Sequence, residues 1–174
     1  MKGTGLIHIY YGDGKGKTTA AMGQAIRAAG SGLKVLVFQF MKNNTSNERK
    51  ILEQIPNVTC LPGKRHVKFY NQMTREEKAE YRHYNTKALD EIAKFCINFD
   101  VLVLDEAVCA ADLGLLSEEK LIHFLQHKPR GLEVVMTGHH VSDELMQLAN
   151  YATEMRKVKH PYDEGRSARA GIEF

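Results

Sequence analysis

The feature that most constrains the fold of this chain is a glycine-rich segment, residues 12–19, between an apolar run and an alanine-rich stretch. The apolar run, residues 6–11, favours a β-strand, and residues 17–29 favour a helix that ends at Gly30. A second apolar run, residues 34–40, is almost continuously hydrophobic, as in a strand buried on both faces of a parallel sheet. Strand, loop, helix and strand in this order predict a right-handed βαβ unit.

The rest of the chain continues this alternation of strands and helices. Thr74 and Glu77 have the spacing of a capping box and open the longest predicted helix. The further predicted strands are residues 58–61, 101–104, 133–137 and 153–158, and the further predicted helices are residues 48–54, 74–99, 117–127 and 142–150. This alternation indicates an α/β fold, with a mostly parallel sheet and helices on both faces.

Residues 12–19 have the composition of a phosphate-binding loop. Glycines let backbone N–H groups turn toward phosphate oxygens, and the N-terminus of the following helix adds partial positive charge. Lys17 would neutralise phosphate charge, and the Thr18 hydroxyl would ligate Mg²⁺. The usual pattern has a glycine five residues before Gly16, where this chain has Tyr11, so the loop is a variant. The residues expected to bind a nucleoside triphosphate are Gly12, Asp13, Gly14, Lys15, Gly16, Lys17, Thr18 and Thr19.

Asp105 and Glu106 directly follow the predicted strand at residues 101–104. A carboxylate in this place would lie beside the phosphate loop and hold Mg²⁺ directly or through water. An acidic helix cap is the alternative interpretation. Together with the loop, the pair predicts a P-loop NTPase domain of the RecA-like kind. Lys17, Glu106 and Asp105 are the catalytic candidates, and Thr18, Glu106 and Asp105 are the candidate Mg²⁺ ligands.

The length of 174 residues fits one domain, so residues 1–174 are expected to form a single P-loop α/β unit. Residues 43–73 are irregular, and no Ser/Gly-rich linker divides the chain there. This stretch is better interpreted as a site-forming insertion or lid than as a domain boundary. We expect it to be mobile without ligands.

Composition narrows the class further. A chain that is 43% hydrophobic and 26% charged is typical of a globular protein. No apolar run approaches the roughly 20 residues that cross a bilayer, and no signal-peptide stretch precedes the loop, so we expect a cytoplasmic protein. The net charge of +3 is too small to indicate general nucleic-acid binding. Three widely spaced cysteines, Cys60, Cys96 and Cys109, are expected to be reduced and mostly buried.

The loop and the helix after it, with the displaced first glycine, closely resemble the P-loop class of ATP:corrinoid adenosyltransferases, bacterial enzymes of cobalamin synthesis and salvage. The likeness continues at residues 37–42, 103–106 and 135–138, and in the closing segment, residues 158–174. The resemblance implies transfer of the 5′-deoxyadenosyl group of ATP to Co(I) of a reduced corrinoid, with release of inorganic triphosphate. It also implies ATP lying reversed in the loop, a homodimer, and a flavin-based electron donor as one source of the reducing electron.

The resemblance also suggests residues for the two substrates. Lys15 and Arg27 would contact the phosphate or ribose of ATP, although both are equally consistent with exposed surface residues. Familiar members carry a Phe-Thr-Trp segment that lines the corrinoid site and helps remove the lower axial ligand of cobalt. This chain has no Trp, and the nearest counterparts are Phe69 and Tyr70, for which ordinary packing is the alternative.

Other functions stay open at this point. The first is a RecA-like ATPase or switch module that couples ATP hydrolysis to nucleic acid or a protein partner, because acidic pairs such as residues 105–106 also orient water in ATP hydrolases. The second is a protein that binds corrinoid without turnover. His123 and His127 have a metal-compatible spacing, but a solvated helix face is favoured. His139 and His140 follow a predicted strand, where α/β sites form.

Overall fold

The structure, a computed structural model, describes residues 3–173 and is built around a six-stranded sheet with the order β3-β2-β4-β5-β1-β6. Every neighbouring pair of strands is parallel. The strands are β1 (Ile7–Tyr11), β2 (Val35–Gln39), β3 (Val58–Cys60), β4 (Val101–Asp105), β5 (Glu133–Thr137) and β6 (Tyr151–Glu154). The predicted α/β fold is thereby confirmed. Phe174, the last residue of the closing segment, lies outside the described residues.

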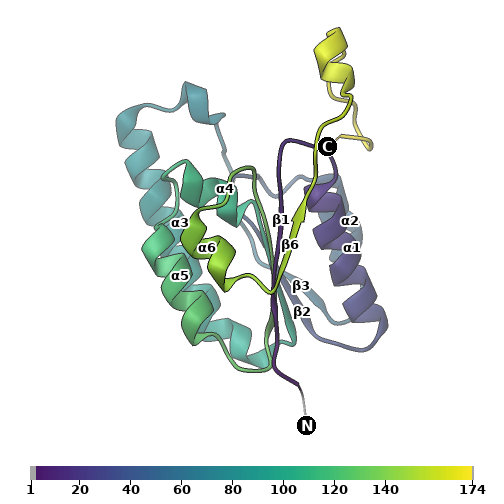
Figure 1. Cartoon of the computed structure of the whole chain (residues 1–174), viewed down its shortest axis with the longest axis vertical. Helices are drawn as coiled ribbons and strands as arrows, with labels where there is room; N and C mark the ends of the chain where they lie inside the picture. Colours follow the sequence, from purple (N-terminus) through teal and green to yellow (C-terminus); the bar gives the residue numbers. More distant parts are fainter. Residues whose placement is uncertain (1–2, 174) are drawn as a thin grey trace.

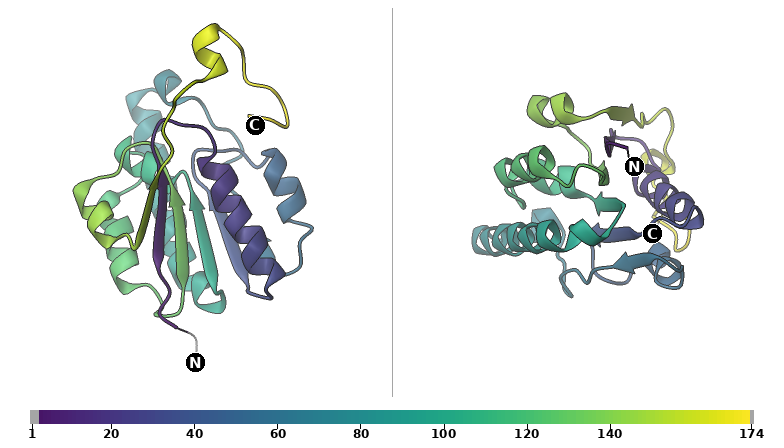
Figure 2. Two further views of the ribbon diagram at one scale, coloured as in Figure 1. Left: turned by 45° about the vertical axis from the view of Figure 1, so that its right-hand side comes forward. Right: turned by 90° about the horizontal axis from the view of Figure 1, so that it is seen from below.

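Helices cover both faces of this sheet (Figures 1 and 2). One face carries α1 (Lys17–Gly30) and α2 (Asn47–Leu52), and the other carries α3 (Arg75–Phe95), α4 (Ala107–Asp112), α5 (Glu118–His127) and α6 (Asp143–Leu148). Short 3-10 helices lie at Tyr70–Gln72, Cys96–Asn98 and Pro161–Glu164. Alternate strand residues serve the two faces, so Val35 and Val37 pack with the alanines of α1, whereas Leu36 and Phe38 pack on the opposite side.

The predicted strand boundaries were least accurate where the hydrophobic pattern of the sequence is weak. All residues of β2 and β4 are buried, which explains why these strands were readily predicted. All residues of β6 are exposed, and this strand occupies Tyr151–Glu154, so the predicted strand at residues 153–158 begins two residues too late and ends four residues too late. Strand β6 lies at the edge of the sheet and pairs on one side only, and neither of its faces is buried, so no hydrophobic alternation marks its position.

Some helix boundaries were also wrong. The longest helix ends at Phe95 and continues as a 3-10 turn, and α6 ends at Leu148. Helix α4 was missed because six residues directly after a strand are too few to display a helical period. All three cysteines are free, but only Cys96 is buried; Cys60 and Cys109 are half-buried.

Because all strands are parallel, their carboxyl ends meet at one edge of the sheet, at the top of Figure 1. The loop after β1, the chain after β3 and the chain after β6 all leave the sheet there. Strand β5 lies between β1 and β4, so the phosphate loop and Asp105 are separated by one strand. The predicted insertion, residues 43–73, is partly regular: β3 is a strand of the sheet and α2 covers one of its faces. The irregular part of the insertion begins after Cys60. Its role as a lid stays a prediction.

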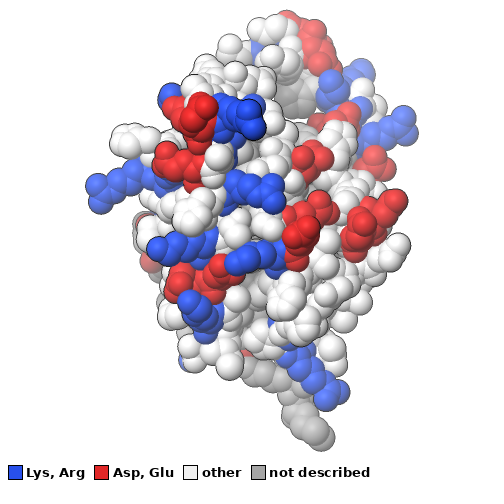
Figure 3. All heavy atoms as spheres, turned by 90° about the vertical axis from the view of Figure 1, so that its left-hand side faces the viewer, with Lys and Arg blue, Asp and Glu red and all other residues white. Residues whose placement is uncertain are grey.

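Charged residues of both signs are mixed over the face of the molecule that Figure 3 presents. In the basic cluster at residues 64–68, Lys64 pairs with Glu80 of α3 at 2.8 Å, and Lys68 pairs with Glu77.

Within residues 3–173, no helix has the length and apolar character needed to cross a membrane.

Candidate functional site

The phosphate loop is shaped by glycines in the left-handed region. Gly12 has φ 106°, and Gly16, the residue before α1, has φ 110°. The Lys17 ammonium folds back over the loop and donates to the carbonyl oxygen of Gly14 at 2.7 Å. Burial lowers the pKa of Lys17, although Asp13 acts in the opposite direction. The loop therefore presents a partly desolvated ammonium at the start of a helix, the arrangement that binds polyphosphate.

Residues 155–157, which we call the strap, follow β6 and lie against this loop. The N–H of Gly14 donates to the Met155 carbonyl oxygen at 2.6 Å, and the N–H of Lys157 donates to Asp13 Oδ1 at 2.8 Å. The hydrogen bond from Lys157 lowers the pKa of Asp13. A Cβ atom at Gly12 or Gly14 would lie 2.5 or 2.6 Å from the Met155 oxygen, closer than real contacts allow. The strap therefore explains why the loop has glycines at these positions.

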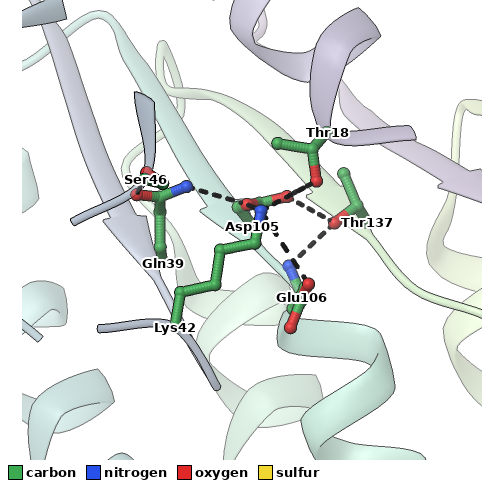
Figure 4. Close-up of polar contacts among 7 residues, drawn as sticks. All are labelled: Thr18, Gln39, Lys42, Ser46, Asp105, Glu106 and Thr137. Atoms are coloured by element: carbon green, nitrogen blue, oxygen red, sulfur yellow. Dashed lines mark hydrogen bonds and ion pairs between the residues drawn. The ribbon is translucent and has the colours of Figure 1, made fainter. Parts of the chain in front are cut away.

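Asp105, at the end of β4, is the centre of a buried polar network (Figure 4). Its side chain is 0% exposed. Oδ1 accepts from the hydroxyls of Thr18 at 2.9 Å and Thr137 at 2.8 Å. Oδ2 accepts from Gln39 Nε2 at 3.1 Å and from Lys42 Nζ at 2.8 Å. The network joins the phosphate loop to three strands, and it brings together Thr18 and Asp105 as the sequence predicted.

Glu106 turns the chain from β4 directly into α4. Its backbone is left-handed, with φ 60°, and its N–H donates to Thr137 Oγ1 at 2.7 Å. This conformation is uncommon outside glycine and is often found at functional sites. Burial, and next the charge of Asp105, raise the pKa of the Glu106 carboxyl to about 7. Glu106 thus lies beside Asp105 but is more exposed, with its carboxylate 3.8 Å from Lys42 Nζ.

Lys42 enters the network because the chain turns sharply after β2. Met41 has φ 52°, and the next side chain points back to Asp105 (Figure 4). Burial lowers the pKa of Lys42, but Asp105 and then Glu106 outweigh burial, so the pKa lies above its ordinary value. Sequence reasoning did not assign Gln39, Lys42 or Thr137 to the site. The available signal was a polar residue directly after an apolar run, at the carboxyl ends of β2 and β5.

The donor set suits magnesium that arrives with a nucleotide. Among residues 3–173, no three His, Cys, Asp or Glu side chains are arranged to hold a metal ion alone. Mg²⁺ typically takes one or two carboxylates and completes its shell with water and substrate phosphates. In addition, Glu48 Oε2 is buried without a hydrogen-bond partner among the described residues, and the Glu48 charge acts on both Lys42 and Glu106. The site thus combines hard oxygen donors with negative charge, as Mg²⁺ requires.

The other candidates lie around this centre. Lys15 is exposed, with Nζ 3.8 Å from a Glu173 carboxylate oxygen. Arg27 is exposed in the last turn of α1, roughly 15 Å along the helix from Lys17, and does not contact the Asp105 network. Phe69 is 81% exposed, whereas Tyr70 is half-buried beneath the Lys78 ammonium, 3.7 Å from the ring centroid.

Three of the candidate histidines have clear structural roles: two form an exposed pair on α5, and one supports the phosphate loop. His123 and His127 are exposed on α5 and stack on each other, with ring centroids 4.2 Å apart, which agrees with the solvated helix face that was favoured. The His139 carbonyl oxygen accepts from the Gly12 N–H at 3.0 Å, so this residue supports the phosphate loop through its backbone. Burial, followed by the charge of Lys17, lowers the pKa of His139.

A lysine over a glycine loop, and a threonine of that loop bonded to a buried aspartate, define a P-loop domain that binds nucleoside triphosphate. A family model described as ATP:corrinoid adenosyltransferase BtuR/CobO/CobP matches residues 3–174. A corrinoid adenosyltransferase of Escherichia coli (strain K12) is 34% identical, over 98% of this chain and 86% of the relative. The corrinoid adenosyltransferase CobA of Salmonella typhimurium is 33% identical, with the same coverage of 98% and 86%. The chain belongs to the ATP:corrinoid adenosyltransferase family.

Among solved structures, domain III of the Thermotoga maritima replication initiation protein DnaA matches with a TM-score of 0.39 and 15% identity, covering 86% of this chain and 53% of that chain. Such a distant likeness says nothing about function. Family membership decides between the functions that the sequence left open: the protein is an enzyme that transfers the adenosyl group of ATP to a corrinoid.

Proposed function

We propose that the site binds Mg·ATP with its triphosphate over the phosphate loop, and that the Asp105 network helps the triphosphate to depart from C5′ of the ribose. The observation that carries this proposal is the Thr18–Asp105 hydrogen bond of 2.9 Å, which ties the loop to a fully buried carboxylate. In the reaction, the electron pair of Co(I) forms the Co–C5′ bond. The C5′–O5′ bond breaks, and its electron pair leaves with inorganic triphosphate.

The protein groups that meet the departing charge lie at the start of α1. By helix geometry, the N–H groups of Lys17, Thr18 and Thr19 have no acceptor within the helix. The N–H of Gly14 is bonded to the strap, so we assign triphosphate binding to these helix N–H groups and to the Lys17 ammonium. Preorganised donors of this kind stabilise a developing anion without reorientation during the reaction.

Thr18, Asp105 and Glu106 are the residues that would hold Mg²⁺. When bound, Mg²⁺ neutralises the negative charge that accumulates on the leaving triphosphate. Thr18 and Asp105 already lie in contact, and Glu106 lies on the more exposed side of the pair. The buried hydroxyl of Thr137 fixes both acidic residues, since it donates to Asp105 and accepts from the Glu106 N–H. Thr137 thereby orients the acidic pair toward the loop.

On the corrinoid side, we assign Phe69 as a contact to the substrate. A phenylalanine that is 81% exposed contributes little to the core, which argues against the packing alternative for this residue. Tyr70 is different, because it packs against the core and carries Lys78 over its ring. Phe69 would press on the lower face of the corrinoid, deny cobalt an axial ligand and so ease reduction of Co(II).

Two further features rest on the family resemblance alone: a homodimer and a flavin-based electron donor. Arg27 and Lys15 as contacts of ATP belong to the same group of proposals. An analytical ultracentrifugation run and a reduction assay with a flavoprotein would test the first two directly. A cytoplasmic location is also proposed, on the sequence evidence that no apolar run is long enough to cross a bilayer and no signal-peptide stretch precedes the loop.

The deciding experiment is anaerobic incubation of the protein with Mg·ATP and chemically reduced cobalamin. The corrinoid spectrum and the phosphate products are followed in the same sample. We expect adenosylated corrinoid and inorganic triphosphate in equal amounts. Formation of ADP and phosphate with an unchanged corrinoid spectrum would overturn the proposal and support an ATPase instead.

A further inference from the structure

Lys42 occupies the position between the two groups to which a magnesium ion would be expected to bind. Its Nζ lies 3.1 Å from Thr18 Oγ1 and 2.8 Å from Asp105 Oδ2 (Figure 4). Mg²⁺ binds oxygen at about 2.1 Å, so an ion on the Thr18 oxygen would lie within about 5 Å of Nζ. Like charges at that separation repel, particularly away from bulk water. The ammonium and the metal ion therefore compete for the same oxygens.

The hydrogen bonds of Asp105 indicate that Lys42 is needed for its charge rather than for its N–H groups. Thr18, Thr137 and Gln39 already donate to this carboxylate, and all three donors are neutral. Within the described part of the chain, Lys42 alone brings a positive charge within 3 Å of it. The carboxylates of Glu106 and Glu48 act on the same ammonium. A cation of another kind at this point would satisfy the same need.

We propose that Lys42 and Mg²⁺ are alternative cations for the Thr18–Asp105 pair, and that the arriving Mg·nucleotide displaces the Lys42 ammonium onto the triphosphate. This inference rests on the proposed function, because it takes Thr18 and Asp105 as the magnesium site. Lys42 has a flexible four-carbon side chain, so it can leave Asp105 without movement of the sheet. The left-handed turn at Met41 keeps it beside the loop. It thus acts as a positioning residue that becomes a contact of the leaving group.

The test compares Lys42→Met with wild type in the absence of ATP and corrinoid. Methionine keeps the length of the four-carbon aliphatic stem of lysine and removes the charged amino group. The matched control is Lys94→Met, because Lys94 is an exposed lysine on α3 that pairs with Glu91. Binding of Mn²⁺, used as a probe for Mg²⁺, is measured by electron paramagnetic resonance. We expect Lys42→Met to bind Mn²⁺ at least tenfold more tightly than wild type and Lys94→Met to be unchanged.

The second half of the proposal is tested with inorganic tripolyphosphate at saturating Mg²⁺. Here we expect the opposite effect: Lys42→Met binds tripolyphosphate several-fold more weakly than wild type, and Lys94→Met binds it equally. Unchanged or weaker Mn²⁺ binding by Lys42→Met would overturn the competition. Unchanged tripolyphosphate binding would overturn the transfer of Lys42 to the leaving group.

A measurement on wild type covers the case in which Lys42→Met does not fold. Acetylation of individual lysines by a soluble ester is followed by mass spectrometry with and without saturating Mg²⁺. We expect Mg²⁺ to raise the reactivity of Lys42 several-fold and to leave Lys94 unchanged; equal reactivity of Lys42 in both conditions would overturn the proposal. Failure of wild type to release triphosphate would instead overturn the proposed function, so the two failures are distinguishable.

Discussion

Replacement of Gly14 by alanine should destabilise the protein, because the strap passes too close to admit a Cβ atom. That atom would lie 2.6 Å from the Met155 oxygen, whereas ordinary contact begins at 3.4 Å, so the strap must retreat by about 0.8 Å. Overpacking of this kind costs about 1–3 kcal/mol. The retreat also breaks the Gly14–Met155 hydrogen bond, which is worth about 1 kcal/mol. We expect a total loss of about 2–4 kcal/mol in the free energy of unfolding.

The matched control is Gly23→Ala, which should have the opposite sign. Gly23 lies inside α1, and a Cβ atom there would meet nothing within 4 Å. Alanine in a helix interior is better than glycine by about 0.5–1 kcal/mol. Both variants are unfolded in urea and followed by circular dichroism. If Gly14→Ala were as stable as wild type, or shifted in the same direction as Gly23→Ala, the strap would not constrain the loop.

Three further predictions concern the site. Lys17→Ala should abolish ATP binding measured by calorimetry and adenosyl transfer with it, because it removes the ammonium over the loop; unchanged turnover would exclude the loop from the mechanism. Phe69→Ala should slow reduction of bound Co(II) and leave both ATP affinity and stability unchanged, since the ring is exposed; a rate equal to wild type would count against corrinoid contact. Burial, and then Glu106, raise the pKa of Cys109 to about 11, so in a variant with this thiol alone the alkylation rate should rise about tenfold per pH unit through pH 9.5. A plateau of that rate below about pH 9 would contradict the raised pKa.

The parts of the fold that sequence reasoning predicted are those with local signals. Strands β2 and β4 are apolar throughout because both of their faces are covered. The phosphate loop is encoded by glycines and by the Lys17–Thr18 pair, all within a few residues of one another. Asp105 was found because it directly follows the apolar run at residues 101–104. Each of these predictions depends only on residues that are close together in the sequence. In each case the structure has the residues at the predicted position.

The rest of the site depends on contacts that no local pattern encodes. Gln39 reaches Asp105 because β2 and β4 pair in register, with these two residues opposite each other. Thr137 reaches it from β5, the neighbouring strand on the other side. Lys42 reaches it through a left-handed turn at Met41, a residue type for which such a conformation is unexpected. A sheet order and one unusual backbone angle thus decide which polar residues join the network.

The position of the first glycine in the phosphate loop is explained by the pairing of β1 with β6 and by the strap that follows β6. Tyr11 is still part of β1, because it pairs with Glu154 and its carbonyl oxygen accepts from the Met155 N–H at 2.7 Å. A position that is paired within a strand does not have to be glycine. A tyrosine side chain is therefore tolerated at residue 11, where the usual pattern has the first glycine. The turn begins one residue later, at Gly12, with φ 106° and with the Met155 oxygen 2.5 Å from where a Cβ atom would lie. The pairing of β1 with β6 therefore sets where the loop can start, and the strap sets which of its residues must lack a side chain.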